Sequence, residues 1–182
     1  MSVFSERFTV RIRAGTRSIR RVSILSVLLA LVSLFPAVEP VSRTGACAGT
    51  EGVTVAVGMA SGVLVRCVPG SPGDARTALQ RSGLAVRLGS GTGPYGDSRY
   101  VCVIEGLPGD DACTGHREGA PFWKVWRVGL DPVAWRESGT QGGPGAVRVC
   151  PGGLVGFGFG TSQPPVSPEQ VVTTPGWLPP RC

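Results

Sequence analysis

The stretch GVTVAVGMASGVLVRCVPGSPGDARTALQRS, residues 52–82, decides which fold is expected for this 182-residue chain. It begins with two runs rich in β-branched residues, 52–58 (GVTVAVG) and 63–67 (VLVRC), separated by a short loop that contains glycine. Two such runs around a short loop are typical of a β-hairpin, because β-branched side chains fit a pleated sheet and glycine permits a tight turn. The first half of the stretch therefore predicts an antiparallel pair of strands.

The second half of the stretch predicts a short helix. Residues 69–73 (PGSPG) contain two prolines and two glycines, which end the preceding strand. Asp74 stands where a helix N-cap belongs, because its carboxylate can accept from the first free backbone N–H groups, and Gly83 can end the helix in the left-handed conformation. The apolar residues that share one face of a helix over 75–82 are Ala75, Ala78 and Leu79.

Further strands are expected after the helix. The runs with strand character cover residues 84–88, 100–105, 122–128, 133–137, 147–150 and 154–159, and YVCVIE at 100–105 is the clearest. One short helix packed against a mixed sheet is an α+β arrangement, and a β-grasp is the natural small version of it. This domain is expected to span residues 47–160. Residues 161–182, with six prolines, are expected to form an extended C-terminal tail.

The charge of the chain is concentrated at its N-terminal end. The formal net charge is +6, but residues 1–46 alone hold seven arginines and two glutamates. Residues 47–182 hold ten arginines and one lysine against ten acidic residues, so this part is nearly neutral and no nucleic acid is expected as a partner. Four tryptophans, six phenylalanines and 42% apolar residues exclude a fully disordered chain.

Residues 1–46 are interpreted as a signal peptide. A cluster of arginines precedes the apolar run 22–38 (VSILSVLLALVSLFPAV), and small residues follow it. Cleavage is expected between Ser42 and Ala48, which leaves a secreted protein without a stable membrane span. Three alternatives remain open: an uncleaved signal anchor, twin-arginine export through Arg20 and Arg21, and a lipid-modified Cys47.

Six cysteines lie downstream of this leader and predict three disulfides in an extracellular protein. They are Cys47, Cys67, Cys102, Cys113, Cys150 and Cys182. Local spacing favours the pairs Cys47–Cys67, Cys102–Cys113 and Cys150–Cys182, although six cysteines permit other connectivities. A structural metal site is not expected, since the chain has no C-x-x-C motif and a single histidine, His116.

No residue set predicts catalysis or a cofactor. Residues 91–96 (GTGPYG) match G-x-G-x-x-G, but a strand follows instead of the helix N-terminus that phosphate binding needs. Cys113 and His116 would act as nucleophile and base only with a reduced thiol. The neighbouring carboxylates at 110–111 lack the alternation of a calcium loop. The chain is therefore expected not to be an enzyme and to hold no metal.

The tryptophans are the candidate ligand-binding residues, namely Trp123, Trp126 and Trp135. Residues 123 and 126 of one strand point to opposite faces, so at most one of them is expected in the core. The other can form an aromatic platform for a planar ligand or a sugar. The competing interpretation is ordinary packing in the core and at a sheet edge.

Several of these segments resemble those of a known family. They are Cys47 with the strand 52–57, LVRCVPG at 64–70, YVCVIEGLP at 100–108, FWKVW at 122–126 and WRESG at 135–139. The chain resembles secreted bacterial proteins that are in turn similar to the transcobalamin C-terminal-like family. This resemblance covers residues 47–160 and implies a β-grasp fold and a corrinoid ligand. The chain departs from the family at 127–129 (RVG), where an asparagine and a glycine are usual.

A second, looser resemblance concerns small secreted proteins similar to subtilisin inhibitors. Residues 67–70 (CVPG) match their C-x-P-G segment, but the expected helix holds no cysteine and Cys102 precedes Val103 rather than proline. The expected function is thus a non-catalytic extracellular binding module, with a corrinoid or another planar small molecule as its ligand. The alternative is an interaction protein, such as a protease inhibitor or a component of the cell envelope.

Overall fold

The computed structural model describes residues 41–89, 100–109, 120–128, 134–138, 143–160, 163–172 and 177–182. Most of the predicted signal peptide, residues 1–40, lies outside the described residues, as do Cys113, His116 and the glycine-rich loop at 91–96. Within the described ranges, no helix is long and apolar enough to cross a membrane.

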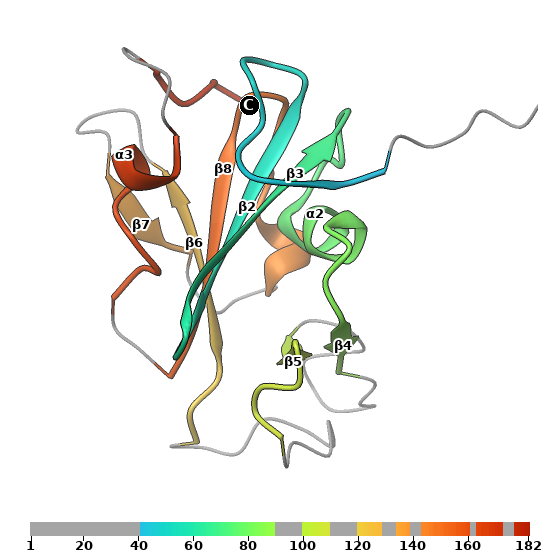
Figure 1. Cartoon of the computed structure of the whole chain (residues 1–182), viewed down its shortest axis with the longest axis vertical. Coiled ribbons are helices and arrows are strands. Elements are labelled where there is room, and N and C mark those ends of the chain that lie inside the picture. Colours follow the sequence, from blue (N-terminus) through green and yellow to red (C-terminus); the bar gives the residue numbers. More distant parts are fainter. Residues whose placement is uncertain are drawn as a thin grey trace, which may run out of the picture. The chain divides into compact units, whose positions relative to one another are not determined.

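Eight strands, two short α-helices and one 3-10 helix make up the described part of the chain (Figure 1). The strands are β1 (Arg43–Thr44), β2 (Gly52–Met59), β3 (Gly62–Pro69), β4 (Val86–Leu88), β5 (Val101–Ile104), β6 (Trp123–Val128), β7 (Trp135–Glu137) and β8 (Leu154–Phe159). The helices are α2 (Ala75–Arg81), the 3-10 helix η1 (Pro144–Ala146) and α3 (Pro168–Val171).

The predicted hairpin and helix are confirmed. Strands β2 and β3 pair antiparallel from Gly52 opposite Pro69 to Met59 opposite Gly62. Asp74 caps α2, since its Oδ1 accepts a hydrogen bond from the backbone N–H of Thr77 at 2.8 Å. The apolar face of α2 is fully buried, as expected for a short helix that is stabilised by packing rather than by propensity.

The main sheet is mixed, in the order β1-β3-β2-β8-β6-β7. Strand β8 pairs parallel with β2 and antiparallel with β6, so the last strand lies in the middle of the sheet beside the first strand of the hairpin (Figure 1). The α+β class is therefore confirmed. Strand β5, the clearest strand in the sequence, forms but pairs only with β4, in a separate two-stranded sheet.

The main sheet has two different faces. The helix face carries large side chains of β2 and β8, which pack with α2, and these are Val53, Val55, Val57, Val155 and Phe157. The glycine face carries Leu154 and three small residues of the same strands, Ala56, Gly58 and Gly156, and Trp135, Pro165 and Val171 pack against it. Both faces of the sheet are thus covered, which explains why the run 52–57 of β2 is buried without alternation.

The predicted strand at 147–150 is not formed. This segment follows η1 and makes only an isolated bridge between Arg148 and Asp74. Its alternation is nevertheless real, because Val147 and Val149 are buried in the helix-face core while Arg148 is exposed. The backbone of Val147 accepts from the N–H of Ala75 at 2.9 Å, so the segment pairs with the start of α2 instead of with the sheet.

The C-terminal segment is more structured than an extended tail. It contains α3, whose N-terminus has a capping box formed by Ser167 and Gln170. Val171 of α3 is buried against the glycine face, and the indole N–H of Trp177 donates to the carbonyl of Gly152 at 3.1 Å. The prolines limit the length of the helix but do not prevent this segment from packing on the sheet.

Two of the three expected disulfides are confirmed. Cys47 is bonded to Cys67, and Cys150 is bonded to Cys182. The first bond ties the segment before β2 to β3, and the second fastens the C-terminal segment to the residues before β8. The third expected bond involves Cys113, which lies outside the described residues.

Candidate functional site

Trp123 and Trp126 are both buried, with 4% and 6% of their surfaces exposed. The expectation that at most one of them joins the core is wrong, because both faces of the sheet are covered. Trp123 lies on the helix face, where its ring packs 5.4 Å from that of Phe159 and its indole N–H donates to the carbonyl of Leu107 at 3.2 Å. Trp126 lies on the opposite face, and its indole nitrogen has no hydrogen-bond partner.

Trp135 is half-buried on the glycine face. A Cβ atom added to Gly156 would lie 3.0 Å from the ring of Trp135, so the absence of a side chain at Gly156 makes room for the indole. The indole N–H donates to the carbonyl of Val166 in the C-terminal segment. The three tryptophans therefore lie on two faces of the sheet and do not form one exposed aromatic platform. A direct role of any of them in ligand binding stays a prediction.

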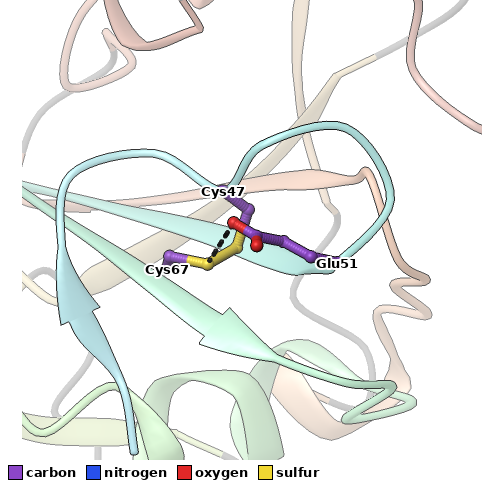
Figure 2. A group of neighbouring side chains, drawn as sticks. All are labelled: Cys47, Glu51 and Cys67. Carbon is purple, nitrogen blue, oxygen red and sulfur yellow. Dashed lines mark hydrogen bonds between the residues drawn. A yellow bond between two sulfur atoms is a disulfide. The ribbon is translucent and has the colours of Figure 1, made fainter.

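Cys47, Glu51 and Cys67 form the one cluster of metal-ligand residue types among the described residues (Figure 2). Their sulfur and carboxylate atoms lie within 4.8 Å of one another. The two sulfurs are bonded to each other, however, and a disulfide offers no thiolate to a metal ion. The cluster is therefore a disulfide with a carboxylate beside it, not a metal site.

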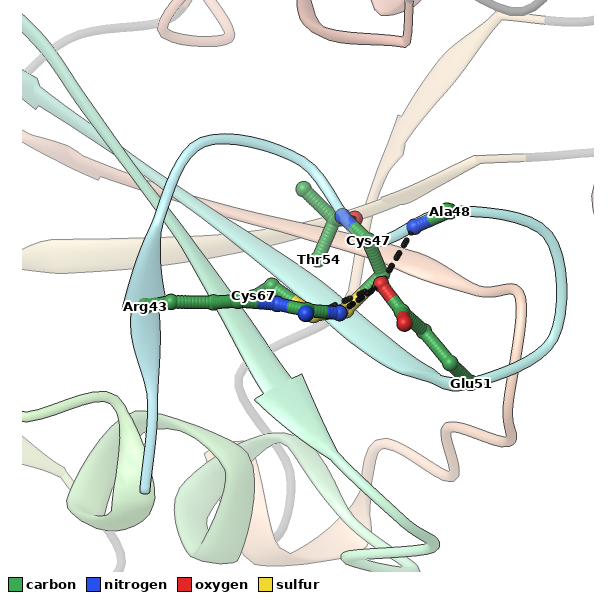
Figure 3. The surroundings of a disulfide bond; sticks show 6 residues. All are labelled: Arg43, Cys47, Ala48, Glu51, Thr54 and Cys67. Atoms are coloured by element: carbon green, nitrogen blue, oxygen red, sulfur yellow. Dashed lines mark hydrogen bonds and ion pairs between the residues drawn. A yellow bond between two sulfur atoms is a disulfide. The ribbon is translucent and has the colours of Figure 1, made fainter. Parts of the chain in front are cut away.

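Glu51 is held beside this disulfide by two donors (Figure 3). Its Oε1 pairs with the guanidinium of Arg43 in β1 and accepts from the backbone N–H of Ala48 at 2.6 Å. The hydrogen bond from Arg43 is the main cause that lowers the pKa of Glu51 below its ordinary value, and the Ala48 N–H adds to it. Arg43 thus links the first strand, inside the predicted signal peptide, to the disulfide-bonded loop.

An open pocket of about 780 Å³ lies between the β6–β7 edge of the sheet and the C-terminus. We call it the arginine pocket. Its walls are residues 127–128, 136–138, 146–150, 153–154 and 179–182. Four of these residues are arginines from separate segments of the chain, namely Arg127, Arg136, Arg148 and Arg181. All four side chains are exposed.

Glu137 is the only acidic side chain among the described residues that line the arginine pocket. Its carboxylate accepts from Lys124 at 3.1 Å, in an ion pair between β6 and β7. Glu137 stands opposite Trp126 in the strand pairing, whereas Arg127 stands opposite Arg136. Because paired residues share a face, the glutamate and the two arginines lie on different faces of this edge. The Glu137 carboxylate is thus paired with Lys124 on the face opposite to that of Arg127 and Arg136.

The sequence gives little indication of the arginine pocket. Its arginines are scattered over 55 positions between 127 and 181, in segments that the β6–β7 pairing and the Cys150–Cys182 bond help to bring together. Residues 47–182 are nearly neutral as a whole. A net charge does not show where the charged side chains lie in space, so it gives no sign of this cluster. No family model, no curated protein and no solved structure matches this chain.

Proposed function

We propose that this chain is a secreted, non-catalytic binding module that takes a small molecule in the arginine pocket, with a corrinoid as the first ligand to test. The observation that carries the proposal is the pocket itself. Its volume of about 780 Å³ falls within the range of about 300–1,000 Å³ that is usual for small-molecule sites. Its walls combine charged side chains with the apolar surfaces of Val128, Leu154 and Pro179.

The strand order supports a β-grasp fold for this module. A hairpin, β2–β3, is followed by one helix that packs on the helix face, and the last strand, β8, enters the sheet parallel to β2. Strands β6 and β7 complete the sheet on the far side of β8. This is the arrangement that the resemblance to the transcobalamin C-terminal-like family implies, and it supports testing a corrinoid.

The disulfides support secretion. Two S–S bonds fasten the segments at either end of the sheet, which is the usual way in which a small extracellular domain supplements a modest core. Intact-mass measurement of the secreted protein with and without reductant tests this part of the proposal. Three disulfides predict a gain of six protons on reduction, and free thiols in the native protein would contradict it.

The ligand is tested by titrating the protein with cobalamin and its precursors while tryptophan fluorescence is recorded. The corrin ring absorbs in the visible range, so saturable quenching is expected if the ring binds near the sheet. The control is Trp123→Phe, which removes one indole that does not line the pocket and keeps the aromatic packing on Phe159. Absence of a response at about 100 μM, equivalent to roughly 5.5 kcal/mol of binding, would exclude the corrinoid.

An interaction protein, such as an inhibitor or a cell-envelope component, is the second candidate. The observation that favours it is Leu178, which is 68% exposed in the C-terminal segment immediately before two prolines. A large apolar side chain on a segment fastened by a disulfide suits contact with another protein. Failure of every small molecule, together with inhibition of a secreted protease that Leu178→Ala removes, would favour this candidate.

The absence of catalysis is also part of the proposal. It rests on His116 being the only histidine of the chain and on cysteines that are expected to be bridged. The test is a screen of hydrolase substrates with the wild-type protein. An activity that His116→Ala abolishes without unfolding the protein would overturn it.

A further inference from the structure

The arginine pocket carries an excess of positive charge that its own acidic side chain does not balance. Arg127, Arg148 and Arg181 have no ion-pair partner among the described residues, whereas Glu137 is already paired with Lys124. Guanidinium groups bind phosphate and carboxylate groups through parallel N–H donors, and several of them together favour a ligand with more than one such group.

The strand pairing also places like charges together. Arg127 and Arg136 are direct partners in the β6–β7 ladder, so their side chains leave the sheet side by side. Like charges directly opposite each other destabilise a strand pair. Positive charge is thus concentrated where Arg127 leaves the sheet, and this charge attracts an anion to that wall of the pocket.

The C-terminal wall of the pocket is fixed in place. Cys150 and Cys182 both line the pocket and are bonded to each other, and the nearby Trp177 donates to the carbonyl of Gly152. These contacts fasten the segment that carries Arg181 to the residues beside Arg148 before any ligand arrives. A preorganised set of cations binds more tightly than a mobile one, because less conformational entropy is lost on binding.

A hydroxyl group at the pocket wall lacks a partner. Ser138 lines the pocket, and its Oγ is buried without a hydrogen bond to any of the residues that the structure describes. A buried hydroxyl that makes no hydrogen bond costs free energy. Rotation of this short side chain toward the pocket would let it donate to an oxygen of the ligand, beside the neighbouring Arg136.

We propose that the arginine pocket binds a multiply charged oxyanion, a ligand with two or more phosphate or carboxylate groups. Arg127, Arg148 and Arg181 supply the charge, and the disulfide-held C-terminus supplies a fixed wall. This proposal deepens the proposed function, on which it rests, by naming the chemical class of the ligand. It does not require an aromatic platform.

The test is calorimetric titration of the purified full chain with sodium tripolyphosphate and, separately, with citrate. Saturable binding that weakens as NaCl is raised is expected, because added salt screens exposed charges. The two probes distinguish a phosphate chain from a polycarboxylate as the better ligand. No binding of either probe at millimolar concentration would overturn the proposal.

Matched variants locate the site. Arg148→Gln and Arg181→Gln remove exposed charges from the pocket, and each is expected to weaken binding about tenfold, which corresponds to about 1.4 kcal/mol. Arg66→Gln is the control, since Arg66 lies on β3 outside the pocket and the substitution makes the same change in net charge. Equal affinities of the pocket variants and the control would overturn the proposal.

The outcomes also separate this proposal from the proposed function. Cobalamin binding that is unchanged in Arg148→Gln and Arg181→Gln, without binding of either anion, would overturn the oxyanion proposal and leave the binding module intact. Anion binding that depends on these arginines, without cobalamin binding, would support the oxyanion proposal and exclude the corrinoid.

Discussion

The helix face and the glycine face belong to the same strands but are built in opposite ways. On the helix face, β2 and β8 contribute valines and Phe157, which fill the space under α2. On the glycine face, the same strands contribute Gly58 and Gly156 beside Leu154, and further bulk comes from Trp135 of β7 and from Pro165 of the C-terminal segment. The two faces thus differ in what fills them: valines and a phenylalanine of β2 and β8 fill the helix face, whereas glycines of these strands leave room for Trp135 and Pro165 on the other face.

The two faces also differ in where along the chain their covering residues lie. The helix face is covered by α2, which follows the hairpin directly and is capped by Asp74 within its own segment. The glycine face is covered partly by Trp135 of β7 and partly by residues that come after β8, in a segment that is fastened through Cys150 and Cys182. We therefore expect substitutions on the helix face to reduce stability most, and substitutions on the glycine face to act through the attachment of the C-terminal segment.

The largest effect is expected for Phe157→Ala. The side chain of Phe157 is fully buried on the helix face, so its removal leaves a cavity and should cost about 3–5 kcal/mol of unfolding free energy. Urea unfolding followed by circular dichroism measures this loss. The control is Phe122→Ala, which removes the same atoms from a half-buried position before β6 and should cost clearly less. Equal losses in the two variants would contradict the assignment of the core to the helix face.

The next effect is expected when the C-terminal disulfide is removed by Cys150→Ser with Cys182→Ser. The bond spans 32 positions, and opening it should cost about 2–4 kcal/mol through the greater freedom of the unfolded chain. The midpoint of urea unfolding should fall, and amide exchange of the C-terminal segment should accelerate more than that of α2. Uniform acceleration throughout the sheet would show that the two faces are not independent.

A smaller effect is expected for Gly156→Ala on the glycine face. The added Cβ would lie 3.0 Å from the Trp135 ring and 3.2 Å from Cδ of Pro165, so both must move, at a cost of about 1–3 kcal/mol. Thermal unfolding gives the loss of stability. The control is Gly145→Ala, where the nearest atom lies 3.9 Å away, on Arg76. A stable Gly156→Ala protein with an unchanged Trp135 environment would exclude close packing on this face.

The smallest effect is expected at the edge of the sheet, away from both cores. Arg43→Gln removes the main cause of the lowered pKa of Glu51, so this pKa should rise toward its ordinary value, while the Ala48 N–H keeps part of the shift. Because the folded-state pKa is lowered, the ion pair stabilises the protein above the ordinary glutamate range, about pH 4.3, and this contribution is lost as the pH falls further.

Nuclear magnetic resonance titration of the Glu51 carboxyl carbon in both proteins measures the difference. The pH dependence of the unfolding midpoint should change only at acid pH. An unchanged Glu51 titration in Arg43→Gln would show that the ion pair does not form in solution.

Local patterns in the sequence predicted the local parts of the fold. The hairpin, the Asp74 cap and the buried face of α2 depend on residues close together in the chain, and they are confirmed. The segment 147–150 has the alternation of buried and exposed residues that is typical of a strand, but it pairs with Asp74 instead of with a strand of the sheet. The sequence periodicity does not show which segment will be the pairing partner. The burial of both Trp123 and Trp126 was missed for the same reason, since it depends on a remote segment that covers the second face.

The arginine pocket was missed because its arginines belong to four separate segments of the chain. The pairing of Arg127 with Arg136 depends on the register of β6 and β7, and the place of Arg181 depends on the disulfide partner of Cys182. The predicted pairing of Cys150 with Cys182 contained the information that the C-terminus returns to the sheet. Combined with the charge of Arg148 and Arg181, it would have indicated a basic cluster.

The central place of β8 has a consequence for the order of folding. Thr54 pairs with Leu154, about one hundred positions later, so the middle of the sheet cannot close until nearly the whole chain is available. The β2–β3 hairpin and α2 can form early. Without β8, however, β2 has no strand paired to its second edge, and α2 packs on only part of its core. Contacts between such distant residues slow folding. We therefore expect a chain that emerges from its N-terminus to complete its core only when β8 arrives.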